Sequence, residues 1–344
     1  MMFNQLIKKN RCFIIAEIGL SHEGSLGVAI SMIDRAIQCG VDAVKFQTHF
    51  PHHESSKWEE FRVNGNLQDK TRYDYWQRTS FSEDTWKIIK NYCDEKNVIF
   101  LSTPFSVYAA EILENLDIAA WKISSGDITN YPLLDFIAST EKPIFLSTGM
   151  SDYSEVKDTV QYLKDRKNDI IVFQCTNSYP CPAEQIGLKE IKKLKKLLKV
   201  GIGFSDHSGK IGTGISAFTF GALALEIHVT WDKAYFGPDV SSSLTFEELN
   251  ILVENIRYLE KSFKSKYNKN DLINSHRDVR SLFMKGIYFK DNLNKNHIIE
   301  YENISFKKPL TDIPASEYKS VLGKKLLENV CIGNPLRKSD IKWD

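Results

Sequence analysis

The sequence lacks a large excess of charge of either sign, and it lacks long hydrophobic runs. Lysine and arginine number 45 against 44 aspartate and glutamate residues, so the net charge of +1 creates no strong field to attract nucleic acid or an anionic membrane. No run approaches the roughly 20 apolar residues that a membrane-spanning helix needs. We therefore expect no nucleic-acid partner and no membrane insertion.

Cysteine is also scarce, and its spacing carries no motif. The six cysteines are scattered and none forms a Cys-x-x-Cys pair, which argues against a disulfide framework and a cysteine-rich zinc site. In the opening Met-Met-Phe-Asn-Gln-Leu-Ile-Lys-Lys, basic residues follow the short apolar patch, whereas in a signal peptide they precede it. These features predict a cytoplasmic protein.

The chain does contain eight short apolar runs, each of which stops at a polar cluster. They cover residues 12–18, 43–46, 99–101, 119–123, 144–146, 170–173, 200–204 and 222–227. Such short, uniformly apolar runs are typical of parallel strands buried on both faces, and stretches of helical length lie between them. Eight strand–helix units predict a (β/α)8 TIM barrel, with its polar clusters gathered at one mouth. An open doubly wound sheet is the alternative.

A change of composition after residue 260 divides the chain. We expect residues 1–264 to form the barrel and the polar residues 265–279, rich in lysine and asparagine, to be a linker. Residues 280–344 should then form a small β-rich domain, with strand-like pieces at 281–284, 287–289 and 304–306.

Two histidines are the strongest candidates for metal ligands. His207 and His228 end consecutive predicted strands, which in a parallel sheet lie about 4.8 Å apart. Two imidazoles at the same height could share one divalent cation of the Mn²⁺ or Mg²⁺ type, with substrate or water completing the shell. Asp206 and Glu226 are near them in sequence and could orient a ring. In the alternative reading, both histidines are polar caps bonded to loops.

Two lysines inside apolar strands are the second signal. Lys45 and Lys122 must either place their ammonium groups at the barrel mouth or bury them at a large cost in free energy. With the hydroxyl groups of Ser125, Ser147, Thr148 and Ser205, they predict a pocket for phosphate or carboxylate. A Schiff-base lysine and lysines that extend to solvent are the alternatives.

Loop residues supply further candidates. Glu23 and Asp127 lie in glycine-bounded loops, placed for proton transfer or hydroxyl binding, and Asp239 follows a Gly-Pro turn. Asn177 and Tyr179 precede a proline in a stiff loop that could form the wall of a site for a polyhydroxylated ligand. His49 and its neighbours at 52 and 53 are interpreted as part of a mobile loop without a role in the site.

Eight motifs, in order along the chain, resemble those of the sialic acid synthase family, the N-acetylneuraminate synthases. They read EIGLSHEGS at 17–25, VKFQTH at 44–49, STPF at 102–105, WKISSGD at 121–127, LSTGM at 146–150, CTNSYP at 175–180, SDHS at 205–208 and GPD at 237–239. The match runs from about residue 11 to the C-terminus. The final domain resembles the antifreeze-like (SAF) domain of that family.

The resemblance implies an enzyme that condenses phosphoenolpyruvate with an open-chain N-acyl hexosamine, such as N-acetylmannosamine, and releases phosphate. It implies that His207 and His228 hold a divalent metal of the Mn²⁺ type, with Mg²⁺ as the alternative, and that Glu23 transfers protons near the reacting carbons. The phosphoenolpyruvate site would be formed by Lys45, Lys122, Thr103, Ser125, Ser147, Asn177 and Ser205, and the sugar site by Gln47, Phe105, Asp127, Tyr179 and Asp239. The family also implies a domain-swapped homodimer.

Two positions depart from the family pattern. Residue 127 is aspartate where relatives often carry glutamate, and Lys308 stands where, in several relatives, an arginine of the SAF domain reaches into the partner's site. A lysine cannot make the planar two-pronged contact of an arginine, so the identity of the amino sugar stays open. Synthases for legionaminic and pseudaminic acids share these motifs. A metal-dependent barrel hydrolase, and a scaffold whose terminal domain binds ice or glycan, are alternatives of other classes.

Overall fold

The computed structural model describes residues 7, 11–61 and 68–343, which form two units. The units are Met1–Lys264 and Ser265–Asp344. Most of the residues on which the expectation about a signal peptide rests lie outside the described part. Among the described residues, no helix is both long and apolar enough to cross a membrane.

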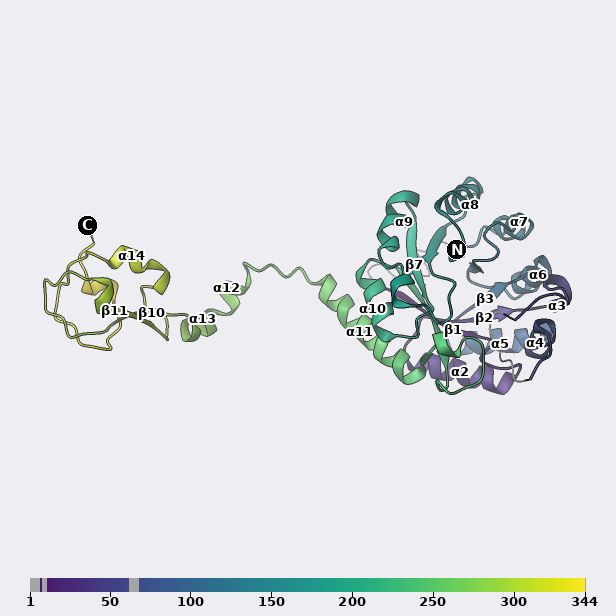
Figure 1. Cartoon of the computed structure of the whole chain (residues 1–344), viewed down its shortest axis with the longest axis horizontal. Coiled ribbons are helices and arrows are strands. Elements are labelled where there is room, and N and C mark those ends of the chain that lie inside the picture. Colours follow the sequence, from purple (N-terminus) through teal and green to yellow (C-terminus); the bar gives the residue numbers. More distant parts are fainter. Residues whose placement is uncertain (1–6, 8–10, 62–67, 344) are drawn as a thin grey trace. The chain divides into compact units, whose positions relative to one another are not determined.

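Eight parallel strands form the centre of the first unit (Figure 1). They are β1 (Phe13–Gly19), β2 (Ala43–Thr48), β3 (Ile99–Pro104), β4 (Trp121–Ile123), β5 (Ile144–Ser147), β6 (Ile170–Gln174), β7 (Gly201–Asp206) and β8 (Ala224–Thr230). Their order is β3-β2-β1-β8-β7-β6-β5-β4, and β3 also contacts β4, although no ladder between these two is among the described pairings. The short β9 (Leu244–Thr245) pairs with β8. The predicted TIM barrel is confirmed as a nearly closed barrel.

Helices surround this barrel (Figure 1). They are α2 (Leu26–Gln38), α3 (Pro51–Glu54), α4 (Arg72–Thr79), α5 (Glu83–Glu95), α6 (Val107–Asn115), α7 (Tyr131–Ser139), α8 (Tyr153–Asp165), α9 (Glu190–Leu198), α10 (Ile211–Thr219) and α11 (Phe246–Lys264). Local sequence explains several of their starts. Ser25, Ser82 and Ser106 accept hydrogen bonds from backbone N–H groups of the first turn, and Asp152 forms a capping box with Glu155.

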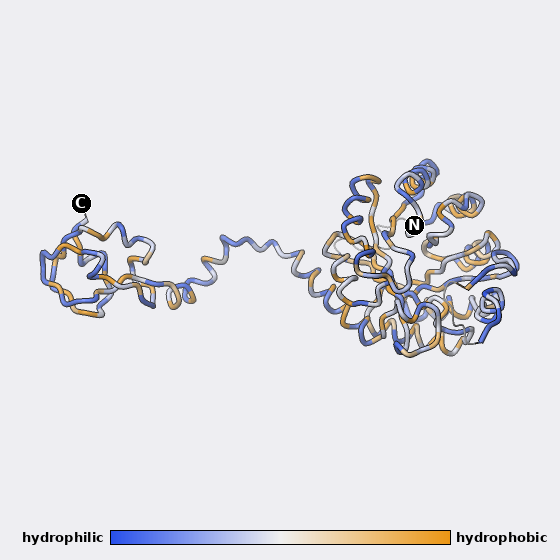
Figure 2. The backbone as a smooth tube through the Cα atoms, viewed as in Figure 1, coloured by the Kyte–Doolittle hydropathy of each residue, from blue (hydrophilic) through white to orange (hydrophobic). Residues whose placement is uncertain are grey.

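Alternation along each strand separates two apolar cores. In β1, Ile14, Ala16 and Ile18 face the helices and join the large outer core, whereas Phe13 and Ile15 face the barrel interior. Figure 2 shows hydrophobic stretches in the barrel, and hydrophobic and hydrophilic residues that alternate along the outer helices.

The lower interior of the barrel is filled by apolar side chains. Phe13 stacks on Phe145, and Phe145 meets Phe173 edge to face, with ring centroids 5.9 and 5.4 Å apart. The same inward parity continues upward to polar positions, so Glu17 follows Ile15 and Ser147 follows Phe145. The interior is therefore sealed at the bottom, and its polar residues gather at the carboxyl ends of the strands.

A buried polar clamp ties α11 to β1. Glu260 Oε1 accepts hydrogen bonds from the backbone N–H of Cys12 and from Arg257 Nη1, both at 2.7 Å. Arg257 also donates to the carbonyl of Cys12 at 2.8 Å and pairs with Asp42 at 2.7 Å. The last helix of the barrel is thus joined to its first strand.

Replacing Glu260 with alanine should lower the free energy of unfolding by about 1–3 kcal/mol, because it leaves a buried backbone N–H without a partner. Denaturant unfolding measures this effect. Glu254→Ala, at an exposed position of the same helix, is the matched control and should change stability by no more than about 0.5 kcal/mol. Equal effects of the two substitutions would contradict the clamp.

The second unit contains α12 (Leu272–Ser275), α13 (Arg277–Phe283), α14 (Tyr318–Val321) and the antiparallel pair β10 (Gly286–Phe289) and β11 (Ile304–Lys307). Isolated β-bridges add to the pairing of these two strands. The small apolar core of the second unit includes Ile287, Phe289 and Leu336. The strand expected at 281–284 is wrong, because most of this segment belongs to α13. Alternation over four residues does not separate a short strand from one helical turn.

Candidate active site

A cavity of about 660 Å³ opens at the carboxyl ends of the barrel strands. It is lined by every residue proposed above for the site except Glu23, Thr148, Asp206 and Lys308. Lys45 and His228, which are 183 positions apart, share this space because all eight strands end at the same mouth. The convergence that the sequence hypothesis needs is therefore present.

The two strand lysines are buried and paired with carboxylates. Lys45 Nζ lies 2.8 Å from Glu17 Oε2 and donates to Thr103 Oγ1 at 3.1 Å. Lys122 Nζ donates to Glu226 Oε2 at 2.6 Å, and the other oxygen of Glu226 lies 3.8 Å from Lys45 Nζ. The two ammonium groups therefore share one network and do not extend to solvent.

The network shifts the pKa values of its members. Burial alone would raise the pKa of Glu226, but the ammonium groups of Lys122 and Lys45 lower it to about 2. Burial lowers the pKa of Lys122, and Glu226 offsets only part of that effect. At Lys45 burial acts in the same direction, yet the Glu17 and Glu226 carboxylates outweigh it and raise the pKa. Two cations thus face two anions at the floor of the cavity.

Hydroxyl groups surround these charges. Ser205 Oγ donates to Glu226 Oε1 at 3.1 Å, and Ser125 Oγ accepts a hydrogen bond from the backbone N–H of Gly149 at 2.9 Å. Ser147 and Asn177 also line the cavity. The cavity floor therefore offers hydroxyl and amide groups beside two ammonium groups, as the recognition of a phosphorylated carboxylate requires.

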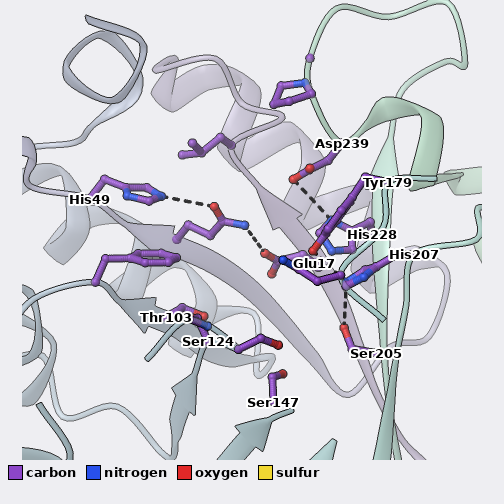
Figure 3. A pocket seen from close by; sticks show the side chains of 18 of the residues that line it. Glu17, His49, Thr103, Ser124, Ser147, Tyr179, Ser205, His207, His228 and Asp239 are labelled. Carbon is purple, nitrogen blue, oxygen red and sulfur yellow. Dashed lines mark hydrogen bonds and ion pairs between the residues drawn. The ribbon is translucent and has the colours of Figure 1, made fainter. Parts of the chain in front are cut away.

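The two histidines lie on one side of the cavity (Figure 3), with ring centroids 5.1 Å apart. His207 Nδ1 lies 2.7 Å from the carbonyl oxygen of Thr176, which can only accept, so Nδ1 carries the hydrogen. His207 Nε2 is left with its lone pair, 3.0 Å from the Tyr179 hydroxyl. Burial, helped by the nearby His228, lowers the pKa of His207 to about 3, so the ring is neutral at neutral pH.

This arrangement fits a divalent metal with an open shell. A carbonyl that fixes the far nitrogen of a neutral imidazole is the usual support of a histidine ligand. Asp239 Oδ2 lies 3.7 Å from His228 Nδ1. Among the residues that the structure describes, no group of three or more His, Cys, Asp or Glu side chains is arranged to hold an ion by itself. A metal here would depend on substrate or water for its remaining ligands.

The opposite wall is aromatic and polar. Gln47 Nε2 donates to Glu17 Oε1 at 2.9 Å, and the His49 ring stacks on both Phe105 and Trp76 (Figure 3 labels His49 and Glu17). The expectation that His49 lies in a mobile loop outside the site is wrong. It is 2% exposed and lines the cavity, and the short helix α3 follows it.

Glu23 and Lys308 are among the proposed site residues that lie elsewhere. Glu23 pairs with Arg78 at 2.9 Å and does not line the cavity, although it lies close to Gly237, which does. Burial raises the pKa of Glu23 although Arg78 acts against it. Lys308 belongs to the second unit, where its ammonium group stands 5.0 Å from the centre of the Phe283 ring.

Sequence reasoning also missed or misassigned several lining residues. Glu17, Glu54, Glu59 and Arg72 received no role, although each lines the cavity. Glu226 was assigned to the histidines, yet its carboxylate binds the lysines. Inward parity was the available signal, because Glu226 is two residues below His228 and so points into the barrel one layer deeper.

The buried His22 should make the stability of the protein depend on pH. Burial, with a smaller contribution from His49, lowers the pKa of His22 from 6.5 to about 3. Between these two pH values the unfolded chain binds a proton at His22 that the folded chain does not. The free energy of unfolding should therefore decrease as the pH is lowered, by up to about 1.4 kcal/mol per pH unit. His22→Phe removes this proton-binding site, so the free energy of unfolding of the variant should depend less steeply on pH, by up to the equivalent of one bound proton. Denaturant unfolding between pH 6 and pH 4 measures this slope. The exposed His53, changed to phenylalanine, is the control, and an unchanged slope in His22→Phe would contradict the prediction.

Comparison with known proteins agrees with this geometry. A model of the NeuB family matches residues 32–268, and a model of the SAF domain matches residues 285–342. An N,N'-diacetyllegionaminic acid synthase of Campylobacter jejuni is 31% identical over 325 residues, which are 93% of this chain and 97% of the relative. Human N-acetylneuraminate-9-phosphate synthase is 34% identical over 257 residues, covering 74% of this chain and 72% of that enzyme.

A solved structure gives the same result. The N-acetylneuraminic acid synthetase of Leptospira borgpetersenii, crystallised in complex with citrate, has a TM-score of 0.69 at 30% identity and covers 80% of this chain and 94% of its own. Family models, sequence relatives and fold therefore agree, and the chain belongs to the NeuB family of sialic acid synthases, with an SAF domain after its barrel.

Proposed function

We propose that the protein condenses phosphoenolpyruvate with an N-acyl hexosamine, N-acetylmannosamine or a close analogue, and releases phosphate. The observation that carries this proposal is the shared cavity of Lys45, Lys122, His207 and His228. Carbon–carbon bond formation between an enol phosphate and an aldehyde needs cations at the phosphate and an electrophile at the aldehyde oxygen. The cavity has groups suited to both.

Lys45 and Lys122, with the hydroxyl groups of Ser125, Ser147 and Ser205, would bind phosphoenolpyruvate. Both ammonium groups are already paired with carboxylates, so they would be shared between Glu17, Glu226 and the substrate. Among the described lining residues, six carboxylates stand against three cationic side chains, which are Lys45, Lys122 and Arg72. A polyanionic substrate and a divalent cation should therefore bind more tightly together than apart.

His207 and His228 would hold that cation, with Mn²⁺ as the proposed ion and Mg²⁺ as the alternative. When bound, it would act as a Lewis acid on the sugar aldehyde oxygen. The chain's own residues orient the reactants: Gln47, Phe105, Tyr179, Asp127 and Asp239 would contact the sugar. Glu23, whose carboxyl pKa is raised by burial, would handle protons only if the loop beside Gly237 brought it to the substrate.

We further propose a cytoplasmic homodimer in which Lys308 of each protomer reaches the sugar end of its partner's cavity. Exposed apolar side chains in the second unit support an interface there, since Leu282 and Phe283 are 62% and 63% exposed. Sedimentation at several concentrations tests the dimer. When His207→Ala and Lys308→Ala protomers are mixed, one cavity of the heterodimer should combine an intact His207 with the intact Lys308 of its partner, so the mixture should be active. A mixture no more active than the two separate variants would contradict exchange of the domain.

Phosphate release with phosphoenolpyruvate, Mn²⁺ and a panel of amino sugars tests the reaction. N-Acetylmannosamine represents the sialic acid branch, and a 2,4-diacetamido-2,4,6-trideoxyhexose represents the legionaminic and pseudaminic branches. Sugar-dependent release of phosphate with formation of a nine-carbon acid is the expected result. No release with any member of the panel would reject the synthase.

A second measurement addresses the metal separately. Titration calorimetry of Mn²⁺ should show tighter binding in the presence of phosphoenolpyruvate, and equal affinity with and without it would contradict the shared site. A barrel hydrolase is less well supported, because the described residues hold no cluster of three or more metal-ligand side chains.

A further inference from the structure

A buried histidine that the proposed function does not use stands in the wall of the cavity. The ring of His49 lies between Trp76 and Phe105, with ring centroids 4.1 and 4.2 Å away and interplanar angles of 14° and 11°. The two stacked rings restrict the His49 ring to motion in its own plane. Its two nitrogen atoms therefore stay in that plane, and their hydrogen-bond partners decide where in it they point.

Both nitrogen atoms of His49 face oxygen atoms. Nδ1 lies 2.5 Å from Glu54 Oε1, and Nε2 lies 3.3 Å from Gln47 Oε1, the contact drawn from His49 in Figure 3. Glu54 is held in turn, because its other oxygen accepts a hydrogen bond from the backbone N–H of Phe50 at 3.2 Å. The pair is buried, with 3% of the His49 side chain and 6% of the Glu54 side chain exposed.

The orientation of the Gln47 amide follows from Glu17. Gln47 Nε2 donates to one oxygen of Glu17 at 2.9 Å, and the other oxygen of Glu17 lies 2.8 Å from Lys45 Nζ. A carboxylate can only accept, so the amide turns its nitrogen toward Glu17 and its oxygen toward His49. An amide oxygen and the Glu54 carboxylate also only accept, so both nitrogen atoms of His49 must carry a hydrogen in this arrangement.

We propose that His49 is a positioning residue, which together with Glu54 holds the Gln47 amide so that its NH₂ group faces Glu17. Without the Nε2 hydrogen the amide can turn, and its oxygen would then face the Glu17 carboxylate. Glu17 would lose a donor, and the position of Lys45 beside it would be less well defined. The inference rests on the proposed function only in that Gln47, Glu17 and Lys45 line the reaction cavity.

The test uses His49→Phe, which keeps a flat ring between Trp76 and Phe105 but removes both nitrogen atoms. We expect kcat/KM for the amino sugar to fall by about 10- to 100-fold, because misplacement of a group beside the reactants has effects of this size. His49→Gln should recover part of the loss, since its amide can donate to Gln47. His53→Phe is the matched control: His53 stacks on Tyr108 at 4.2 Å but does not line the cavity, and its replacement should have no effect.

A double-mutant cycle separates positioning from packing. If His49 acts through Gln47, then His49→Phe should change kcat/KM by no more than about twofold in a Gln47→Ala background. A loss in that background as large as in the wild type would overturn the inference. So would wild-type kcat/KM in the single variant His49→Phe.

A second readout does not depend on activity. In protein labelled with ¹⁵N-histidine, the ring signals of His49 can be assigned by their loss in His49→Phe, and Nε2 is expected to carry a hydrogen. An Nε2 without a hydrogen would overturn the inference whatever the enzyme turns over. Absence of turnover with every sugar would reject the proposed function and leave this measurement to decide the role of His49.

Discussion

Replacing either His207 or His228 with alanine should lower kcat/KM on the order of a thousandfold or more, since a bound metal supplies several kcal/mol of transition-state stabilisation. The barrel should remain folded, because both side chains line the cavity and belong to neither apolar core of the barrel. Steady-state phosphate release measures the first effect and thermal unfolding the second. Binding of Mn²⁺, followed by calorimetry, should be lost in both variants.

His53→Ala is the control for the loss of an imidazole, because His53 is exposed and outside the cavity. Activity that survives in His207→Ala and still responds to Mn²⁺ would contradict a shared metal site. A chelator should reproduce the loss in the wild-type protein, and restored Mn²⁺ should reverse it. Chelation without effect would count against a metal as strongly as an active alanine variant.

The second large effect is expected at Glu226. Glu226→Ala should lower the free energy of unfolding by about 3–5 kcal/mol at pH 7, because Lys122 and Lys45 would remain buried with one carboxylate between them. Glu226→Gln should cost less, since its amide oxygen still accepts from Lys122 and Ser205. Denaturant unfolding followed by tryptophan fluorescence suits this test, because Trp343 is the only one of the six tryptophans in the second unit.

The pH dependence of stability tests whether the buried ammonium group of Lys122 causes the loss in Glu226→Ala. Burial already lowers the pKa of Lys122, and without Glu226 it should fall further below that of the unfolded chain. Below pH 10.5 the unfolded chain of the variant then keeps a proton on Lys122 that the folded variant has begun to lose. The folded variant is therefore stabilised as pH rises toward 10.5, and the difference in stability between Glu226→Ala and wild type should shrink. In the wild type, the contribution of Glu226 itself should be lost as pH falls from 4.5 toward 2.

The double variant Glu226→Ala/Lys122→Met completes a cycle. Removing one buried ammonium group together with the carboxylate should restore part of the lost stability, so the two substitutions should not be additive. Additive losses would mean that the two side chains act independently, in disagreement with the 2.6 Å contact between them.

Strand periodicity explains why four of the predicted site residues line one cavity. Lys45, Lys122, His207 and His228 were identified because each is a polar residue at the end of an apolar run. In a parallel barrel that position alone directs a side chain to the mouth, and all four line the cavity. Glu226 obeys the same rule, but its partners depend on depth in the barrel. It lies one layer below His228 and therefore meets the lysines.

His49 shows the opposite case. Nothing in its immediate sequence distinguishes it from the exposed histidines of α3, because burial here comes from Trp76 on α4 and Phe105 after β3. Contacts among three separate segments decide its role. For the same reason the pairing of Glu17 with Lys45 across β1 and β2 was not predicted, since it requires the register of two strands.

The sequence by itself determined the barrel, its second domain and the residue types gathered at the mouth, because apolar runs of strand length and their polar ends are local properties of the chain. Only the tertiary structure decided which charges neutralise one another and which nitrogen of a histidine carries a hydrogen. Those properties depend on distances of about 3 Å between residues far apart in sequence, and local patterns do not encode such distances.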